Sequence, residues 1–179
     1  MSTATLPRTA PARPAYGLVA GAAGAVAGVI HLLAGPEHIE GPIVVTAFFL
    51  AVGTAQLFMA AVLVGHTLRP RHLVGLVAAH VALIGLYVAS RTVDLPFVAP
   101  HLHGHDVGPE AAPGAVGNGI PVYPGARVEP VGAADLVCVG AELVLVVALL
   151  AGLPARWRRG TLDVLVLVCM GAVVLRLAM

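Results

Sequence analysis

Apolar residues occur along the chain in long runs, separated by shorter clusters of polar residues, glycine and proline. A helix needs roughly 20 residues to cross about 30 Å of hydrocarbon, and several of these runs have that length with few charges inside. The predicted membrane-spanning helices cover residues 15–34, 42–64, 73–90, 134–153 and 161–178. The pattern therefore predicts an all-α fold: an integral membrane helical bundle with five transmembrane helices, forming a single transmembrane domain over residues 15–179.

The composition agrees with a membrane protein and excludes several classes. Charged residues make up 11% of the chain and hydrophobic residues 59%, whereas about a quarter of a soluble domain is charged. The formal net charge is only +1, so no nucleic-acid surface is predicted. Every basic residue apart from histidine is arginine, and without lysine no Schiff base to retinal or pyridoxal phosphate can form. Cys138 and Cys169 lie in apolar runs, which indicates buried thiols rather than a disulfide framework.

The charged residues that flank the spans predict the orientation in the membrane, because cytoplasmic loops are enriched in arginine. The arginines before the first span, between the second and third, and between the fourth and fifth are Arg8, Arg13, Arg69, Arg71, Arg156, Arg158 and Arg159. All of these segments should face the cytoplasm. The N-terminus is then cytoplasmic, the C-terminus outside, and the loop 91–133 extracytoplasmic. We expect a multi-pass protein of the plasma membrane.

Two features of the N-terminal part need separate interpretation. Residues 1–14 are rich in proline, threonine and alanine, which predicts a disordered cytoplasmic tail. A cleaved signal peptide over residues 1–34 is the alternative, but the apolar run is too long for a typical signal sequence. Glycines then recur at helical spacing in the first span and predict close packing against another helix. They are Gly17, Gly21, Gly24 and Gly28.

Ionisable residues inside the spans are candidates for function, because such groups are costly in lipid and usually face the bundle interior. In the third span His80, Tyr87 and Arg91 share one helical face. In the fourth span Asp135, Cys138 and Glu142 are spaced by three and four residues and share a face as well. Gln56 is a further polar group in the second span, of the kind that often only joins helices together.

The helical rise of about 1.5 Å per residue places these groups in depth. Glu142 would lie roughly 12 Å and His80 roughly 15 Å below the outer ends of their helices, so the two should meet near the midplane. His31 should lie shallower, because we expect Gly35 and Pro36 to end the first helix. We predict an outward-facing polar funnel with His80 and Glu142 at its floor. Without an arginine partner, Glu142 should be protonated or bound to a cation.

The mouth of this funnel is predicted from residues near the helix ends. Glu37, His38 and Glu40 would line the rim. The alternative for Glu40 is a solvated residue near the start of the second helix, where the helix dipole favours it. Arg91 and Asp94 are expected to form a structural ion pair that closes the third helix, since buried charges are usually paired.

The outer loop contains a second cluster, in the stretch "HLHGHD". His101, His103, His105 and Asp106 lie within six residues, and imidazoles beside a carboxylate suit zinc or copper. Histidines in loops rich in glycine and proline can also have no role. The rest of the loop has many turn formers and is expected to be an irregular surface segment.

Several familiar chemistries are not indicated. The chain has no glycine-rich phosphate loop, no HExxH, no CxxC and no nucleophile elbow. Haem held by two histidines is disfavoured, because His31 and His80 are expected at different depths.

Several stretches of the sequence resemble a group of small polytopic membrane proteins from actinobacteria that have no assigned activity. The stretches are "GPEHIE", "FFLAVGTAQL", "SRTVDLPF" and "VGAADLVCVGAELVLV". The residues that carry the resemblance are Pro36, Glu37, His38, Phe48, Phe49, Gln56, Arg91, Asp94, Pro96 and Glu142. It implies a membrane protein with these motifs on the outer side and brings no activity with it. The histidine-rich loop is an addition to that pattern.

The leading hypothesis is that the funnel binds a transition metal, copper or zinc, for uptake, sensing or delivery. The loop histidines would capture the metal, and a second site would use His31, Glu37, His38 and Glu142, with His80 beneath. An accessory or structural subunit of a larger membrane complex is one alternative. A membrane enzyme that acts on a lipid or quinone through histidine and glutamate is another, although the sequence favours a protein that is not an enzyme. The expected partners are membrane lipid and either further copies of the chain or a larger membrane complex.

Overall fold

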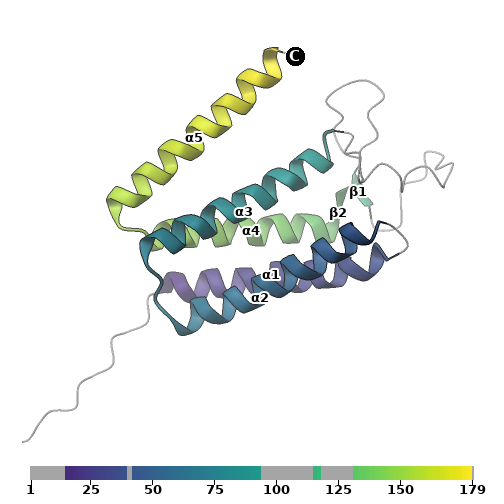
Figure 1. The fold of residues 1–179 in the computed structure, drawn as a ribbon, viewed down its shortest axis with the longest axis horizontal. Coiled ribbons are helices and arrows are strands. Elements are labelled where there is room, and N and C mark those ends of the chain that lie inside the picture. Colours follow the sequence, from purple (N-terminus) through teal and green to yellow (C-terminus); the bar gives the residue numbers. More distant parts are fainter. Residues whose placement is uncertain (1–14, 40–41, 94–114, 118–130, 179) are drawn as a thin grey trace, which may run out of the picture.

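The structure is a computed structural model that describes residues 15–39, 42–93, 115–117 and 131–178. Nearly all of this is helix (Figure 1). The helices are α1 (Ala15–Glu37), α2 (Ile43–Gly65), α3 (Pro70–Ser90), α4 (Ala133–Gly152) and α5 (Ala155–Ala178). The all-helical fold predicted from the sequence is confirmed. Among the described residues four helices, α1 to α4, are long and apolar enough to cross a membrane, and α5 is not one of them.

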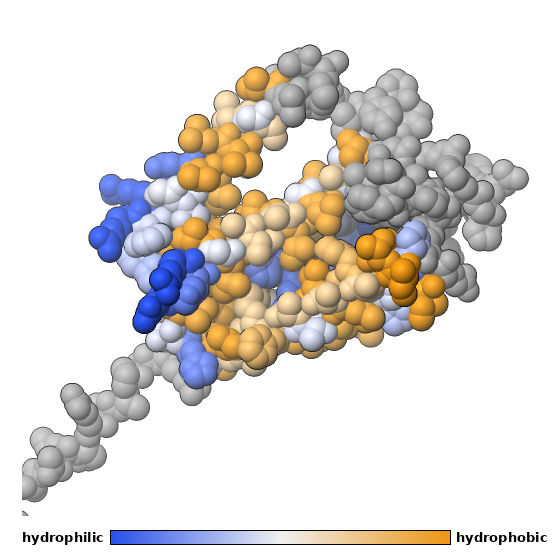
Figure 2. All heavy atoms as spheres, viewed as in Figure 1, coloured by the Kyte–Doolittle hydropathy of each residue, from blue (hydrophilic) through white to orange (hydrophobic). Residues whose placement is uncertain are grey.

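Helix α1 lies at the centre of the packing, between α2 and α4, and α3 packs on α4 (Figure 1). Helix α5 contacts α3 near its own start and then diverges from the bundle. The start of α1, the connection from α2 to α3 and the connection from α4 to α5 all lie at one end, where Figure 2 shows a cluster of hydrophilic residues. The predicted grouping of these segments at one end of the bundle is therefore observed.

Glycines allow the backbones of α1 and α2 to approach closely, as their spacing predicts. A Cβ atom added to Gly28 would lie 3.0 Å from the carbonyl oxygen of Gly53, and one added to Gly53 would lie 2.7 Å from the oxygen of Gly28. A Cβ at Gly17 would similarly meet the carbonyl oxygen of Leu63 at 2.7 Å. This close approach places the next turns of the two helices, which carry His31 and Gln56, in direct contact.

The apolar core occupies the half of the bundle nearer the arginine-bearing end. Its fully buried members include Leu73 and Val77 of α3 and Leu145 and Leu149 of α4. Burial of such side chains stabilises the bundle through packing between helices. It gives little hydrophobic stabilisation, because the surrounding lipid is as apolar as the side chains are. The buried polar side chains of Gln56, His80 and Glu142 lie next to this core, near the middle of their helices.

Two expectations about chain segments were wrong. Helix α1 does not end before Gly35 and Pro36 but runs to Glu37, with Pro36 inside it. A proline removes only one backbone hydrogen bond there, and His38 closes the last turn through its Nδ1, 2.9 Å from the oxygen of Ala34. The loop after α3 is also not wholly irregular, since β1 (Ala115–Gly117) pairs antiparallel with β2 (Val131–Gly132) next to α4.

The predicted helix boundaries differ at two further points. Helix α3 begins at Pro70 instead of residue 73, where proline suits the first helical turn. Helix α5 begins at Ala155 instead of residue 161. An apolar run marks the part of a helix that suits hydrocarbon, and hydrogen bonding extends the helix into polar sequence on either side. The predicted tail 1–14 lies outside the described residues.

Candidate metal centre

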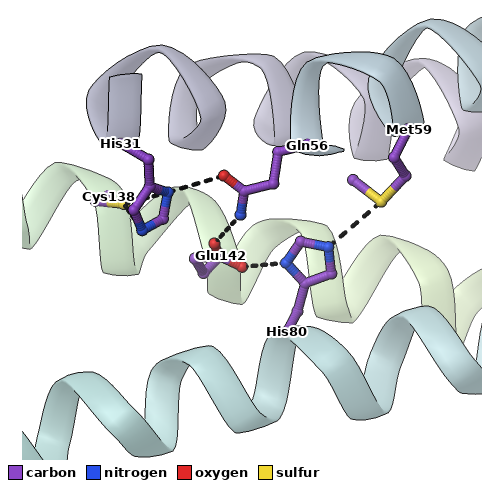
Figure 3. A network of polar contacts seen from close by, with 6 residues as sticks. All are labelled: His31, Gln56, Met59, His80, Cys138 and Glu142. Carbon is purple, nitrogen blue, oxygen red and sulfur yellow. Dashed lines mark hydrogen bonds and ion pairs between the residues drawn. The ribbon is translucent and has the colours of Figure 1, made fainter. Parts of the chain in front are cut away.

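Six side chains from four helices meet in one polar network inside the bundle (Figure 3). The network consists of His31 of α1, Gln56 and Met59 of α2, His80 of α3, and Cys138 and Glu142 of α4. Gln56, His80 and Glu142 are each only 3% exposed. Burying polar groups this deeply costs free energy unless they are hydrogen-bonded, so the stability of this part of the bundle depends on their hydrogen-bond partners.

Glu142 is the centre of the network. Its Oε1 accepts a hydrogen bond from Nε2 of Gln56, and its Oε2 is paired with Nδ1 of His80. The predicted meeting of His80 with Glu142 is therefore observed. Each carboxylate oxygen has a second lone pair, so both contacts leave acceptor capacity on Glu142.

Gln56 connects this pair to His31. Because the amide nitrogen of Gln56 faces the carboxylate, its oxygen faces His31, at 2.8 Å from Nδ1. An amide oxygen only accepts, so Nδ1 of His31 carries the proton in this bond. In a neutral imidazole the other nitrogen, Nε2, is then left with a free lone pair, which is the form that binds metals.

Cys138 lies next to His31 and one helical turn before Glu142. Its Sγ is 3.9 Å from Nε2 and 4.0 Å from Nδ1 of His31. One ligand atom each from His31, Cys138 and Glu142 lies within 4.8 Å of the others. A tetrahedral zinc ion, about 2.0 Å from nitrogen and 2.3 Å from sulfur, would separate those two atoms by about 3.5 Å. Coordination would thus need a small turn of the imidazole ring and an approach of roughly an ångström or less by the donor atoms.

His80 and Met59 form the deeper part of the network. Nε2 of His80 is 3.4 Å from Sδ of Met59. A thioether is a soft and weakly accepting group, so this nitrogen is directed at sulfur and away from the three-residue donor group. His80 thus lies between Glu142 and Met59 and supports the carboxylate of Glu142.

Of the residues predicted for the rim, Glu37 lies at the end of α1 and His38 just after it, and Glu40 lies outside the described residues. Glu37 is exposed, and His38 is partly buried and stacks against Phe49 with ring centroids 4.7 Å apart. The ring of His31 contacts the same phenyl ring from 5.9 Å. Glu37 and His38 are not brought into the donor group of His31, Cys138 and Glu142.

Arg91 has a partner that the sequence interpretation did not pair with it. Its Nη2 donates to Oδ2 of Asp135 at 2.9 Å, and the backbone N–H of Gly132 donates to the same oxygen at 2.8 Å. These bonds join the end of α3 to the start of α4. Asp94, predicted as the partner of Arg91, lies outside the described residues. So do His101, His103, His105 and Asp106, which were predicted as metal ligands.

Three members of the network were not predicted as part of a site. Cys138 was interpreted as a buried apolar residue, Gln56 as an amide that joins helices, and Met59 was not singled out. The spacing of Cys138 and Glu142 by four residues already placed the thiol and the carboxylate on one face. The role of Gln56 depends on the approach of α1 to α2, which sequence spacing does not measure.

Comparison with protein-family models, with curated proteins and with solved structures gave no match for this chain. Its function must therefore be argued from the site itself.

Proposed function

We propose that this protein binds a transition metal ion, copper or zinc, inside the helical bundle, with His31, Cys138 and Glu142 as ligands. The observation that carries the proposal is the convergence of an imidazole, a thiol and a carboxylate from α1 and α4 within 4.8 Å. Thiolate and imidazole are the protein ligands that copper and zinc prefer. Two of the ligands, His31 and Glu142, belong to the set expected from the sequence, and Cys138 replaces Glu37 and His38 in the proposed site.

The surroundings of the three ligands support this role. Metal-binding histidines usually donate their other ring N–H to an oxygen acceptor, which fixes the ring and its tautomer. Gln56 does this for His31, and together with His80 it also orients Glu142. A single amide thus holds two of the proposed ligands in position.

Three protein ligands leave a fourth position around a tetrahedral ion. An open position suits an ion that is passed on or exchanged, so the proposal favours uptake, sensing or delivery over a purely structural metal. Copper in its reduced form would be favoured if Met59, whose sulfur lies close to His80, approaches the ion. Zinc would be favoured by the carboxylate of Glu142.

The proposed orientation places the arginine-bearing end in the cytoplasm. The site is then nearer to the outer surface, since Cys138 lies only about 8 Å along α4 from its first residue. Metal would enter from the outside, and the loop histidines His101, His103 and His105 would capture it first.

Metal analysis of the detergent-purified protein tests the proposal. After growth with copper and zinc supplied, we expect close to one bound ion per chain, lost in Cys138→Ser and in His31→Ala. Cys169→Ser is the matched control, because Cys169 is an exposed free cysteine on α5. Substitution with cobalt should give a thiolate charge-transfer absorption that is absent in Cys138→Ser and retained in Cys169→Ser. Equal metal content in the wild type and both site variants would contradict the proposal.

A second candidate is an accessory subunit whose buried polar groups serve to join helices. It is favoured by the hydrogen bonds themselves, which connect α1, α2, α3 and α4 without any ion. Under this alternative the protein contains no metal, and Cys138→Ser leaves its stability unchanged. Copurification of a larger complex from native membranes, with no metal in the chain, would favour this candidate.

A further inference from the structure

A groove separates α5 from α3 at the arginine-bearing end of the molecule. Its walls are formed by one face of α3, including Val74 and Ala78, and by one face of α5, including Gly160 and Val164. Figure 2 shows the opening between α5 and the rest of the bundle. Unlike the interface of α1 with α2, this space is not closed by side chains from either helix.

The groove is apolar along its length and charged at its mouth. Arg156 and Trp157, in the first turn of α5, line the end of the groove that lies with the other arginines. Arg71 precedes Val74 by three residues and therefore lies on the same side of α3. Asp163, the acidic residue of α5, is exposed and does not line the groove.

We propose that this groove binds an anionic glycerophospholipid, with an acyl chain between α3 and α5 and the phosphate at Arg156. The apolar walls suit a hydrocarbon chain, and the guanidinium group suits a phosphate. Trp157 has the amphipathic ring that is typical of the level of lipid headgroups. The proposal concerns a site separate from the metal centre and does not depend on it.

Charge argues against a second copy of this chain as the occupant. All copies in one membrane share an orientation, so a neighbouring α5 would bring its own arginines to the same level. Arg156, Arg158 and Arg159 of two chains would then lie at the same level, where like charges repel. A lipid with a negative headgroup neutralises the mouth instead.

Fluorescence of Trp157 gives a direct test, because it is the only tryptophan in the chain. The full chain is reconstituted in phosphatidylcholine vesicles, and brominated phosphatidylglycerol or brominated phosphatidylcholine is added as the quencher. We expect brominated phosphatidylglycerol to give the same quenching at about one fifth of the mole fraction that brominated phosphatidylcholine requires. One arginine near an anionic headgroup predicts a preference of this size. Equal quenching by the two lipids would overturn the proposal.

Two variants and a matched control locate the effect. Arg156→Gln should remove the preference for the anionic lipid, while Arg159→Gln, on the same helix but not lining the groove, should retain it. Gly160→Leu should fill the groove and reduce quenching by brominated acyl chains, since a Cβ there meets no described atom within 4 Å.

If Arg159→Gln abolishes the preference as fully as Arg156→Gln, the attraction belongs to the basic surface and the groove proposal fails. Quenching that falls as the protein concentration rises would assign the groove to a second copy and would also overturn it.

Discussion

Helices α2 and α5 flank the bundle on opposite sides and pack in opposite ways. Helix α2 approaches α1 so closely that glycines replace side chains at the contact, whereas α5 leaves an open groove against α3. The polar network lies on the closely packed side and includes no residue of α5. Buried polar groups in a membrane need fixed neighbours at hydrogen-bonding distance, and close backbone packing provides them. The apolar side chains of α5 can remain separate from the bundle because lipid is as apolar as a protein neighbour.

The largest effect should come from filling the α1–α2 contact. In Gly53→Leu the new side chain would meet the backbone of Gly28 and the side chain of Leu32, both of which are closer than 3.0 Å to an added Cβ. We expect a loss of about 3 kcal/mol or more in stability, measured as a lower unfolding temperature in detergent. Gly171→Leu on α5 is the control, because nothing lies within 4 Å of its added Cβ. Similar losses in the two variants would mean that the two sides of the bundle do not differ in packing.

A smaller effect should follow from removing the acceptor at the centre of the network. Glu142→Leu leaves Nε2 of Gln56 and Nδ1 of His80 without their partner and should cost about 2 kcal/mol. Glu142→Gln keeps the volume and one acceptor, so its thermal unfolding should lie between the wild type and Glu142→Leu. If Glu142→Leu is as stable as the wild type, the network does not hold the closely packed side together.

The smallest of these effects is expected where α3 ends and α4 begins. The side chains of Arg91 and Asp135 are 13% and 32% exposed, so water and salt weaken their attraction. Asp135→Asn should lower stability by about 0.5 kcal/mol, because the amide oxygen can still accept from Gly132. The difference should shrink further in high salt, measured on the same detergent preparation. A larger loss that is independent of salt would show that the contact is not mainly ionic.

Much of the fold follows from the sequence because apolar runs of helical length leave few alternatives in a membrane. The pairing of His80 with Glu142 was also predictable, since counting residues from the helix ends gives the two side chains a similar depth. The glycine spacing of the first span predicted its close packing in the same way. In each case residue spacing within the individual helices contains the information.

The rest depends on contacts between helices, which the spacing along one helix does not determine. The end of the first helix was expected at Gly35 and Pro36, yet α1 continues to Glu37. The link from His31 through Gln56 to Glu142 depends on how α1, α2 and α4 meet. Cys138 and Cys169 both lie between apolar residues, and the position of α1 beside α4 is what brings His31 to the thiol of Cys138. The role of Asp135 as a partner of Arg91 likewise required the meeting of two helix ends.

The separation of Gln56 from Glu142 by 86 residues has a consequence for biosynthesis. A ribosome that adds about 5–20 residues per second needs roughly 4–17 s to reach Glu142 after it has made Gln56. During that interval α1 and α2 can already enter the bilayer as a hairpin, and the bond between His31 and Gln56 lies wholly within it. The hairpin therefore keeps the polar side chains of His31 and Gln56 hydrogen-bonded to each other until α4 is inserted and supplies the carboxylate of Glu142.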